Sequence, residues 1–249
     1  MKRVSQRIYA GETLDICIMH TCKGDIGKKN PRPRERFKNQ DERESFNNGR
    51  ALRRCIRLVN ENFTPAGYYI TLTFDDENEL YNFDDAKKVR TKLRRKLTEN
   101  CNQDKFIIFM GRGRNTSRIH FHMIYEGKNL QFLLSNWKYG KVINCKHLRV
   151  NNIDPDTGQY IGRDYTGLVR YLWQHWTPEQ GGQHCMHTRN LRQPTKEPAK
   201  EIKRTYSPEK PPKEPKGYKY IKCTANTQYG YQCFHYVIDS KPGSNKKQI

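Results

Sequence analysis

The chain of 249 residues carries 47 lysines and arginines against 26 aspartates and glutamates, which gives a formal net charge of +21 at pH 7. Its hydrophobic fraction is 34%, below the roughly 45–50% of an average globular chain, so a large core is excluded and we expect one domain with appended segments. The sequence has no run of about 18 apolar residues and no apolar segment after its basic start, so we expect neither a membrane-spanning helix nor a secretory signal.

Such an excess of positive charge indicates a polyanionic partner. Nucleic acid is the leading candidate, because every phosphate that a lysine or arginine neutralises releases counterions. An anionic membrane surface is the second candidate, but the sequence has no basic amphipathic helix with enough apolar content. A charge that serves only solubility is the third.

The chain has eight cysteines at mostly long spacings and no Cys-x-x-Cys pair. Disulfide scaffolds are shorter and denser in cysteine, so we expect free thiols. Two local clusters, at residues 17–22 (CIMHTC) and 184–187 (HCMH), leave a structural zinc site open as an alternative, although neither has the usual paired spacing.

The first part of the chain predicts an arm and a helix. Residues 1–38 are polar and basic, with KKNPRPR at 28–34, and this composition is typical of an arm outside the folded core. Apolar residues at helical spacing then predict a helix over residues 39–60.

Alternation and helical periodicity predict the elements that follow. In chain order they are a strand at 68–74, a helix at 84–97, strands at 105–110 and 118–125 around a turn at 111–117, a helix at 130–137, a strand at 141–150, a turn at 151–162 and a helix at 164–176. Residues 189–217, rich in Pro, Lys and Glu, predict a linker or extended arm, and residues 218–238 predict one or two strands.

This order predicts an α+β fold, with a central antiparallel sheet, helices packed on one face of it, a basic N-terminal arm and a C-terminal strand extension. We expect three regions: an arm and helix at 1–60, a central domain at 61–178, and a linker with the strand extension at 179–249.

Two histidines stand one residue apart in the strand at 118–125. Side chains alternate across a strand, so His120 and His122 share one face while Ile119, Phe121 and Met123 share the other. Two imidazoles so close together can hold one divalent metal ion. On its own, such a pair is more often a surface feature than a metal site.

The helix at 164–176 contains two tyrosines with different surroundings. On a helical wheel of about 100° per residue, Tyr165 lies in the middle of an apolar stripe. Tyr171 lies on the opposite face with Arg170, Gln174 and His175. The periodicity therefore predicts that Tyr165 is in the core and that Tyr171 points outward among polar groups.

Three motifs occur in a fixed order: TLTF at residues 71–74, HFH at 120–122 and a helical tyrosine in GLVRYLWQ at 167–174. In this combination the chain resembles the HUH endonucleases, and more closely the rolling-circle replication initiators (Rep proteins) of bacterial plasmids and phages. The resemblance extends over roughly residues 45–195, and it implies that residues 61–178 form a nicking domain.

The resemblance implies a metal-dependent, site-specific single-strand DNA endonuclease and strand transferase. His120 and His122 would hold Mg²⁺ or Mn²⁺ against the scissile phosphate. Tyr171 would attack the phosphorus, which leaves a 5′-phosphotyrosine link and a free 3′-hydroxyl, and the reverse step would rejoin strands. The substrate would be single-stranded DNA or an origin hairpin in the cytoplasm of a bacterial host. The sequence has no Gly-x-x-x-x-Gly-Lys-Ser/Thr loop, so a separate helicase and a DNA polymerase are the expected partners.

Two positions depart from the pattern of that family. Gln174 stands where a lysine usually follows the nucleophile by three residues, so Arg170 or the metal would have to favour the phenolate, since a free tyrosine ionises only near pH 10. No carboxylate precedes the histidine strand to serve as a third metal ligand. We expect His175, about 40° from Tyr171 on the wheel, to be that ligand, with Gln174 and Asp75 as alternatives.

Basic residues around these motifs are expected to follow a phosphate backbone, while nearby aromatic rings stack on unpaired bases. The predicted DNA contacts are Arg94, Arg95, Arg112, Arg114, Arg118, Arg170 and Gln174. A solvated surface is the ordinary place of any single arginine, so it is the cluster that carries this prediction.

Two alternatives remain. A conjugative relaxase or a single-strand transposase of the same superfamily is disfavoured, because relaxases place the tyrosine before the histidine motif and these transposases are usually shorter. A DNA-binding protein that keeps the fold without the chemistry is the other alternative, since the usual carboxylate and lysine are missing.

Overall fold

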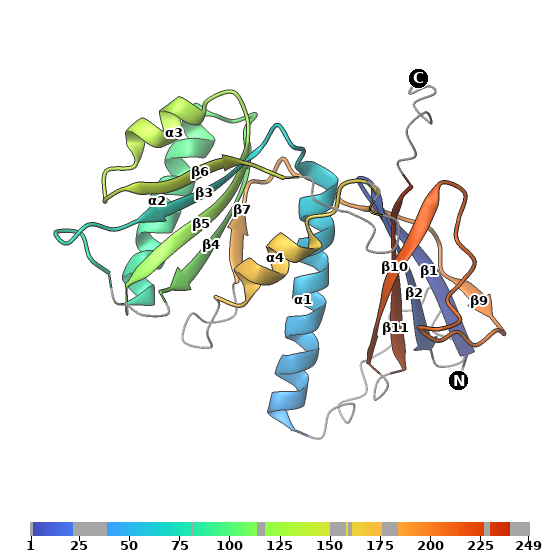
Figure 1. The fold of residues 1–249 in the computed structure, drawn as a ribbon. Helices are drawn as coiled ribbons and strands as arrows, with labels where there is room; N and C mark the ends of the chain where they lie inside the picture. Colours follow the sequence, from blue (N-terminus) through green and yellow to red (C-terminus); the bar gives the residue numbers. More distant parts are fainter. Residues whose placement is uncertain are drawn as a thin grey trace. The chain divides into compact units, whose positions relative to one another are not determined.

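The computed structural model describes residues 2–21, 39–80, 82–113, 118–149, 158, 161–175, 184–226 and 230–239. The chain divides into two compact units, whose elements Figure 1 labels. The terminal unit comprises Met1–Glu61, Asn151–Asp164 and Gln193–Ile249, and the central unit comprises Asn62–Val150 and Tyr165–Arg192. Helices pack on antiparallel sheets, so the predicted α+β class is confirmed. Among the described residues, no helix has the length and apolar content that crossing a membrane requires.

The central unit is built on a sheet with the strand order β6-β3-β5-β4-β7. The strands are β3 (Tyr68–Thr73), β4 (Lys105–Arg112), β5 (Ile119–Glu126), β6 (Val142–His147) and β7 (Cys185–His187), and all neighbours are antiparallel. The helices are α2 (Phe83–Asn100), α3 (Leu130–Asn136) and α4 (Thr166–Trp173). These confirm the strands and helices predicted from 68 to 176, with their ends shifted by a few residues, and β7 is an addition.

One face of this sheet is covered by α2 and α3. Phe121 and Met123 of β5 are fully buried there, in one apolar cluster with Leu93 and Leu97 of α2 and Leu133 of α3. Burial of this face is the main source of stability of the unit, because each such side chain contributes on the order of 1.5–3 kcal/mol. It fixes the side of the sheet that each β5 side chain occupies.

The other face of the sheet receives α4 (Figure 1), so the prediction that helices cover only one face is wrong. The reason lies in the apolar stripe of α4, since Val169 and Leu172 must be removed from water and are buried. Ile107 and Ile124, on the same face of the sheet as the two histidines, are also fully buried. Both faces of the central sheet are therefore used for packing.

The sheet of the terminal unit has the order β10-β11-β2-β1-β8, and β9 also pairs with β1. Its strands are β1 (Lys2–Ala10), β2 (Thr13–Thr21), β8 (Thr195–Lys196), β9 (Lys200–Ile202), β10 (Tyr218–Asn226) and β11 (Tyr231–Ile238). Helix α1 (Gln40–Asn62) belongs to this unit up to Glu61 and confirms the helix predicted at 39–60.

The prediction of a basic arm is wrong for residues 2–21, which form the β1–β2 hairpin inside this sheet. Leu14 and Ile16 alternate with polar side chains and are buried in a cluster with Phe234 of β11. Because the partner strand lies near the other end of the chain, local composition does not reveal this pairing. The basic stretch at 28–34 lies outside the described residues.

The C-terminal part of the chain is also more regular than its composition indicates. The two strands predicted within 218–238 are confirmed as β10 and β11. Within the predicted linker at 189–217, β8 and β9 both pair with β1. That segment therefore contributes edge strands to the terminal sheet.

The cysteines of the described residues carry free thiols, as expected, and Cys22 lies outside these residues. His184 stacks on Trp173 with 4.1 Å between ring centroids. Neither sequence cluster of cysteine and histidine forms a group of three metal-ligating side chains within the part of the chain that is described.

A network of buried charged groups lies on the face of the terminal sheet that α1 contacts. His235 Nδ1 lies 2.7 Å from an Asp15 oxygen, and its Nε2 lies 2.9 Å from an Asp164 oxygen. Arg57 of α1 donates to the second Asp15 oxygen at 2.6 Å. Burial lowers the pKa of His235, but hydrogen bonds and charge attraction from both carboxylates outweigh it and raise the pKa to about 9. Two cations therefore balance two carboxylates inside the unit.

We expect His235 to make the stability of the terminal unit depend on pH. An imidazole ordinarily titrates near pH 6.5, so a folded-state pKa of about 9 stabilises the fold fully below pH 6.5 and stops doing so as pH rises through 9. The difference in unfolding free energy between the wild type and His235→Asn should therefore shrink by about 3 kcal/mol between pH 6 and pH 9.5. Urea unfolding at both pH values measures it, and the other titrating groups are common to both proteins.

The matched control is His147→Asn, which changes an exposed histidine of the central unit. A constant difference between wild type and His235→Asn across this pH range would contradict a charged His235.

Candidate active site

His120 and His122 lie on β5, the middle strand of the central sheet. Their neighbours across the sheet are Thr73 and Thr71 on β3, and Gly111 and Phe109 on β4. Their side chains are on the face opposite the apolar cluster of α2 and α3, as the alternation predicts. His120 Nε2 and His122 Nε2 lie only 2.9 Å apart, and the two nitrogens therefore converge on one point.

The third histidine comes from the turn that ends α4. Ring nitrogens of His120, His122 and His175 all lie within 4.8 Å of one another, which makes them a candidate metal-binding group. The ring centroids of His175 and His122 are 5.1 Å apart. The structure thus brings together all three histidines that the sequence indicated as metal ligands.

Gly111 is the position on β4 that lets His175 approach. A Cβ atom there would lie 2.8 Å from the Cβ of His175 and 3.1 Å from His120 Nε2. Contacts this short force a shift of the backbone or of the ring. The absence of a side chain at 111 is therefore a condition for the cluster of three histidines.

The environment keeps two of these imidazoles neutral. Burial, and then the neighbouring rings of His120 and His175, lower the pKa of His122 to about 3. Burial and His175 also lower the pKa of His120. A neutral imidazole has a nitrogen lone pair to donate, which is the form that binds metal ions.

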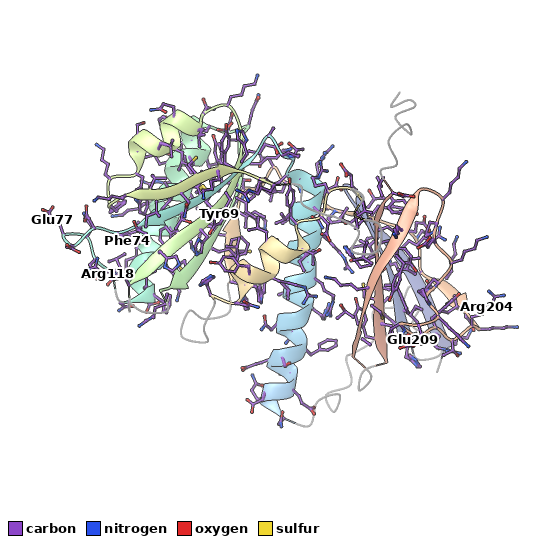
Figure 2. The ribbon with its side chains drawn as sticks, viewed as in Figure 1. Tyr69, Phe74, Glu77, Arg118, Arg204 and Glu209 are labelled. Atoms are coloured by element: carbon purple, nitrogen blue, oxygen red, sulfur yellow. The ribbon has the colours of Figure 1, made fainter. Side chains whose placement is uncertain are left out.

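Tyr69 and Thr71 on β3 support His122 from behind. The Tyr69 hydroxyl lies 2.8 Å from His122 Nδ1, and the Thr71 hydroxyl lies 3.3 Å from the same nitrogen and donates to Tyr69 at 3.2 Å. With the proton on Nδ1 directed to the tyrosine oxygen, Nε2 keeps its lone pair toward the cluster. Figure 2 labels Tyr69 within the central unit.

The two tyrosines of α4 lie as predicted. Tyr165 is 3% exposed and Tyr171 is 46% exposed, one of two large apolar or aromatic side chains to reach such exposure among the described residues. The Tyr171 ring lies 4.9 Å from the His175 ring and 6.4 Å from the His122 ring, between centroids. An accessible phenol therefore stands directly beside the histidine cluster.

Two further predicted residues flank this tyrosine. Arg170 and Gln174 are both exposed, and Gln174 caps the C-terminal end of α4. Asp75, an alternative third ligand, instead accepts hydrogen bonds from Asn78 and is not part of the histidine group.

The other predicted DNA contacts lie away from the cluster. Arg94 and Arg95 are on α2, which covers the opposite face of the sheet, and Arg112 lies over the Phe83 ring of α2 at 5.0 Å. Arg118 forms ion pairs with Asp76 and Glu79. Arg114 lies outside the described residues.

Figure 2 shows Arg118 at the same end of the central unit as Glu77, on the acidic loop that follows β3. Its charge is therefore compensated locally. The structure groups Tyr171 with His120, His122, Arg170 and Gln174, and it leaves the arginines of α2 and of the β4–β5 end elsewhere.

The donor set fits a divalent transition-metal ion. Two nitrogens 2.9 Å apart have the spacing of two ligands of one ion with metal–nitrogen bonds of about 2.0–2.1 Å. Imidazole suits ions that accept nitrogen, whereas Mg²⁺ prefers oxygen. No carboxylate joins the group within the described residues.

Sequence reasoning missed Tyr69, Thr71 and Gly111. The signal for the first two was present, because strand alternation with the buried Ile70 and Leu72 assigns them to the histidine face. Gly111 had no such signal, since it stands in a segment where glycine is also expected in a turn.

The comparison with known families matches this part of the chain. Residues 67–172 match the model of a family described as replication-associated protein ORF2. The match runs from β3 to α4, and it contains His120, His122 and Tyr171. Searches of curated proteins and of solved structures found no match. The central unit is therefore similar to replication-associated proteins, which supports a function in DNA replication.

We predict that Tyr69→Phe weakens Mn²⁺ binding about 10-fold or more, because a metal-bound histidine depends on the hydrogen bond to its other nitrogen. Isothermal titration of the full chain with Mn²⁺ measures the affinity. Tyr68→Phe is the matched control, since Tyr68 stacks on His147 and packs against the opposite, apolar face. Equal affinities for the wild type and Tyr69→Phe would contradict this role.

Proposed function

We propose that this protein initiates rolling-circle replication by nicking and rejoining single-stranded DNA through Tyr171. The observation that carries the proposal is the exposed Tyr171 ring beside a group of three histidines. The match of residues 67–172 to a replication-associated family supports it independently. The net charge of +21 supports a nucleic-acid substrate.

In the proposed reaction, the Tyr171 oxygen attacks the scissile phosphorus. The new bond joins this oxygen to phosphorus, and the bond to the 3′-oxygen breaks. The hydroxyl proton leaves Tyr171, and the 3′-oxygen ends as a hydroxyl that a polymerase can extend. One phosphodiester replaces another, so the reverse step rejoins strands with no further energy source.

His120, His122 and His175 would hold the divalent ion. Of Mg²⁺ and Mn²⁺, we propose Mn²⁺, because a set of three imidazoles lacks the oxygen ligands that Mg²⁺ prefers. A bound ion would neutralise charge on the phosphate that Tyr171 attacks. Tyr69 and Thr71 would hold the His122 ring in the orientation that this requires.

Arg170 and Gln174 would contact the DNA next to the reacting phosphate. Arg170 lies directly before Tyr171 and is exposed, so its charge can favour both the phosphate and the phenolate. Gln174 supplies no charge in the place where related initiators usually carry lysine. The proposal therefore assigns the activation of Tyr171 to Arg170 and to the metal site.

The remaining parts of the proposal follow from the same resemblance. The substrate would be an origin hairpin or its single strand, on a plasmid or phage in the bacterial cytoplasm, and a separate helicase and polymerase would act with the protein. A relaxase remains disfavoured, because here the histidines precede the tyrosine along the chain. A protein that binds DNA without cutting it is the competing function that the next experiment tests.

We expect a single-stranded origin oligonucleotide with Mn²⁺ to give a covalent protein–DNA adduct. Tyr171→Phe should abolish the adduct, because it removes the attacking oxygen and leaves the ring in place. Denaturing gel electrophoresis with labelled DNA, followed by mass spectrometry of the linked peptide, measures it.

Tyr165→Phe is the matched control on the same helix, where the tyrosine is buried, and it should retain the adduct. An adduct that persists in Tyr171→Phe would disprove the assignment of the nucleophile. DNA binding by the wild type with no adduct under any metal would favour the non-catalytic function.

We also expect binding to single-stranded DNA to weaken steeply with salt, with a slope of log affinity against log salt of about −0.7 for each phosphate contact. Arg170→Ala should make this slope shallower by about 0.7. Fluorescence anisotropy at several salt concentrations measures both values, and Arg95→Ala tests the predicted contact of α2 in the same way. A slope near zero for the wild type would contradict binding through the phosphate backbone.

A further inference from the structure

A pair of cysteines lies in the middle of the terminal sheet. Cys17 on β2 and Cys233 on β11 are directly opposite each other on neighbouring antiparallel strands (Figure 1). Their sulfur atoms are 3.0 Å apart, and the residues are 2% and 5% exposed. Opposite residues of such strands have Cα atoms about 4.5–5.5 Å apart, which lies within the range that a disulfide spans.

The surroundings of the pair favour a thiolate. Arg57 of α1 approaches both sulfurs, with its Nη2 3.1 Å from Cys17 and 3.5 Å from Cys233, and the Tyr231 hydroxyl lies 3.3 Å from the Cys17 sulfur. A guanidinium beside a sulfur stabilises its ionised form. The hydrogen bond with Cys233 lowers the pKa of Cys17 to about 7 against the effect of burial, with Arg57 adding to it.

The two sulfurs differ in their protonation. The same hydrogen bond and burial raise the pKa of Cys233 well above its ordinary value. Cys17 is then the ionised, attacking sulfur, and Cys233 is the protonated partner. Burial raises the pKa of Cys145 and of Cys223, which therefore stay thiols.

A metal ion is a poorer occupant of this place. No third cysteine, histidine or carboxylate oxygen completes a metal-binding group with the pair among the residues described in this unit. Arg57 contacts both sulfurs and repels a cation. The pairing of two sulfurs without a third ligand is typical of a dithiol that is oxidised.

We propose that Cys17 and Cys233 form a reversible disulfide when the protein meets hydrogen peroxide. The Cys17 thiolate attacks one peroxide oxygen, the O–O bond breaks, and the products are a sulfenic acid on Cys17 and hydroxide. The Cys233 sulfur then attacks the Cys17 sulfur, the S–O bond breaks, and water leaves with the Cys233 proton. Peroxide is reduced and two thiols are oxidised. Because both sulfurs are buried, a small oxidant is required.

The disulfide would tie the two ends of the chain together. Cys17 and Cys233 are 216 positions apart, and the bond would join the β1–β2 hairpin to the β10–β11 hairpin. Cross-links over long loops stabilise the folded state by restricting the unfolded chain. This site involves none of the residues proposed for DNA cleavage, so it stands or fails independently of the proposed function.

The test treats the full-length, reduced protein with hydrogen peroxide at pH 7 and maps peptides by mass spectrometry without reduction. We expect a linked pair of peptides containing Cys17 and Cys233, lighter by two hydrogens, which dithiothreitol separates. The link should form at least about tenfold faster than oxidation at Cys223, because only Cys17 is substantially ionised. The melting temperature should rise by about 5–10 °C on oxidation and fall again on reduction.

Cys233→Ser should abolish the linked peptide and the rise in melting temperature, while Cys223→Ser, a matched change on the adjacent strand β10, should retain both. The peptide map of the wild type needs no variant, so it decides even where Cys233→Ser folds poorly. Peroxide oxidation that leaves Cys17 and Cys233 unlinked, or that links either one to another cysteine instead, would overturn the proposal.

Discussion

The candidate site depends on the alternation of side chains along one strand. β5 is the middle strand of the central sheet, and Phe121 and Met123 can be buried only on the face that α2 and α3 cover. Once they are buried there, His120 and His122 must both point to the other face. A shift of register by one residue would exchange the two faces, so the apolar core is what holds the imidazole nitrogens within reach of one ion.

The second element of the site, α4, is positioned by a similar constraint. Its apolar stripe must be buried against the sheet, which turns Tyr165 inward and leaves Tyr171 exposed. The approach of the helix end is limited by β4, where Gly111 leaves room for His175. The metal ligands and the proposed nucleophile therefore come from two elements whose distance is set by packing, not by the polar residues themselves.

Much of the central unit could be predicted from the sequence because its patterns are local. Alternation over a few residues identifies β3 and β5, and helical periodicity separates Tyr165 from Tyr171. The terminal unit could not be predicted in this way. Leu14 and Ile16 alternate as a strand should, but the basic composition around them indicates an arm, and their partner Phe234 lies near the other end of the chain. Pairing across such a separation leaves no local pattern in a single sequence.

The contrast between His122 and His235 shows why residue type alone does not assign a role. Both are buried, and burial by itself lowers the pKa of an imidazole. His122 has only other imidazoles as close ionisable partners, so its pKa falls to about 3 and its nitrogen remains available to a metal ion. His235 has a carboxylate at each nitrogen, so its pKa rises to about 9 and both nitrogens are occupied. The neighbours, contributed by distant parts of the chain, therefore make one histidine a candidate ligand and the other a structural cation.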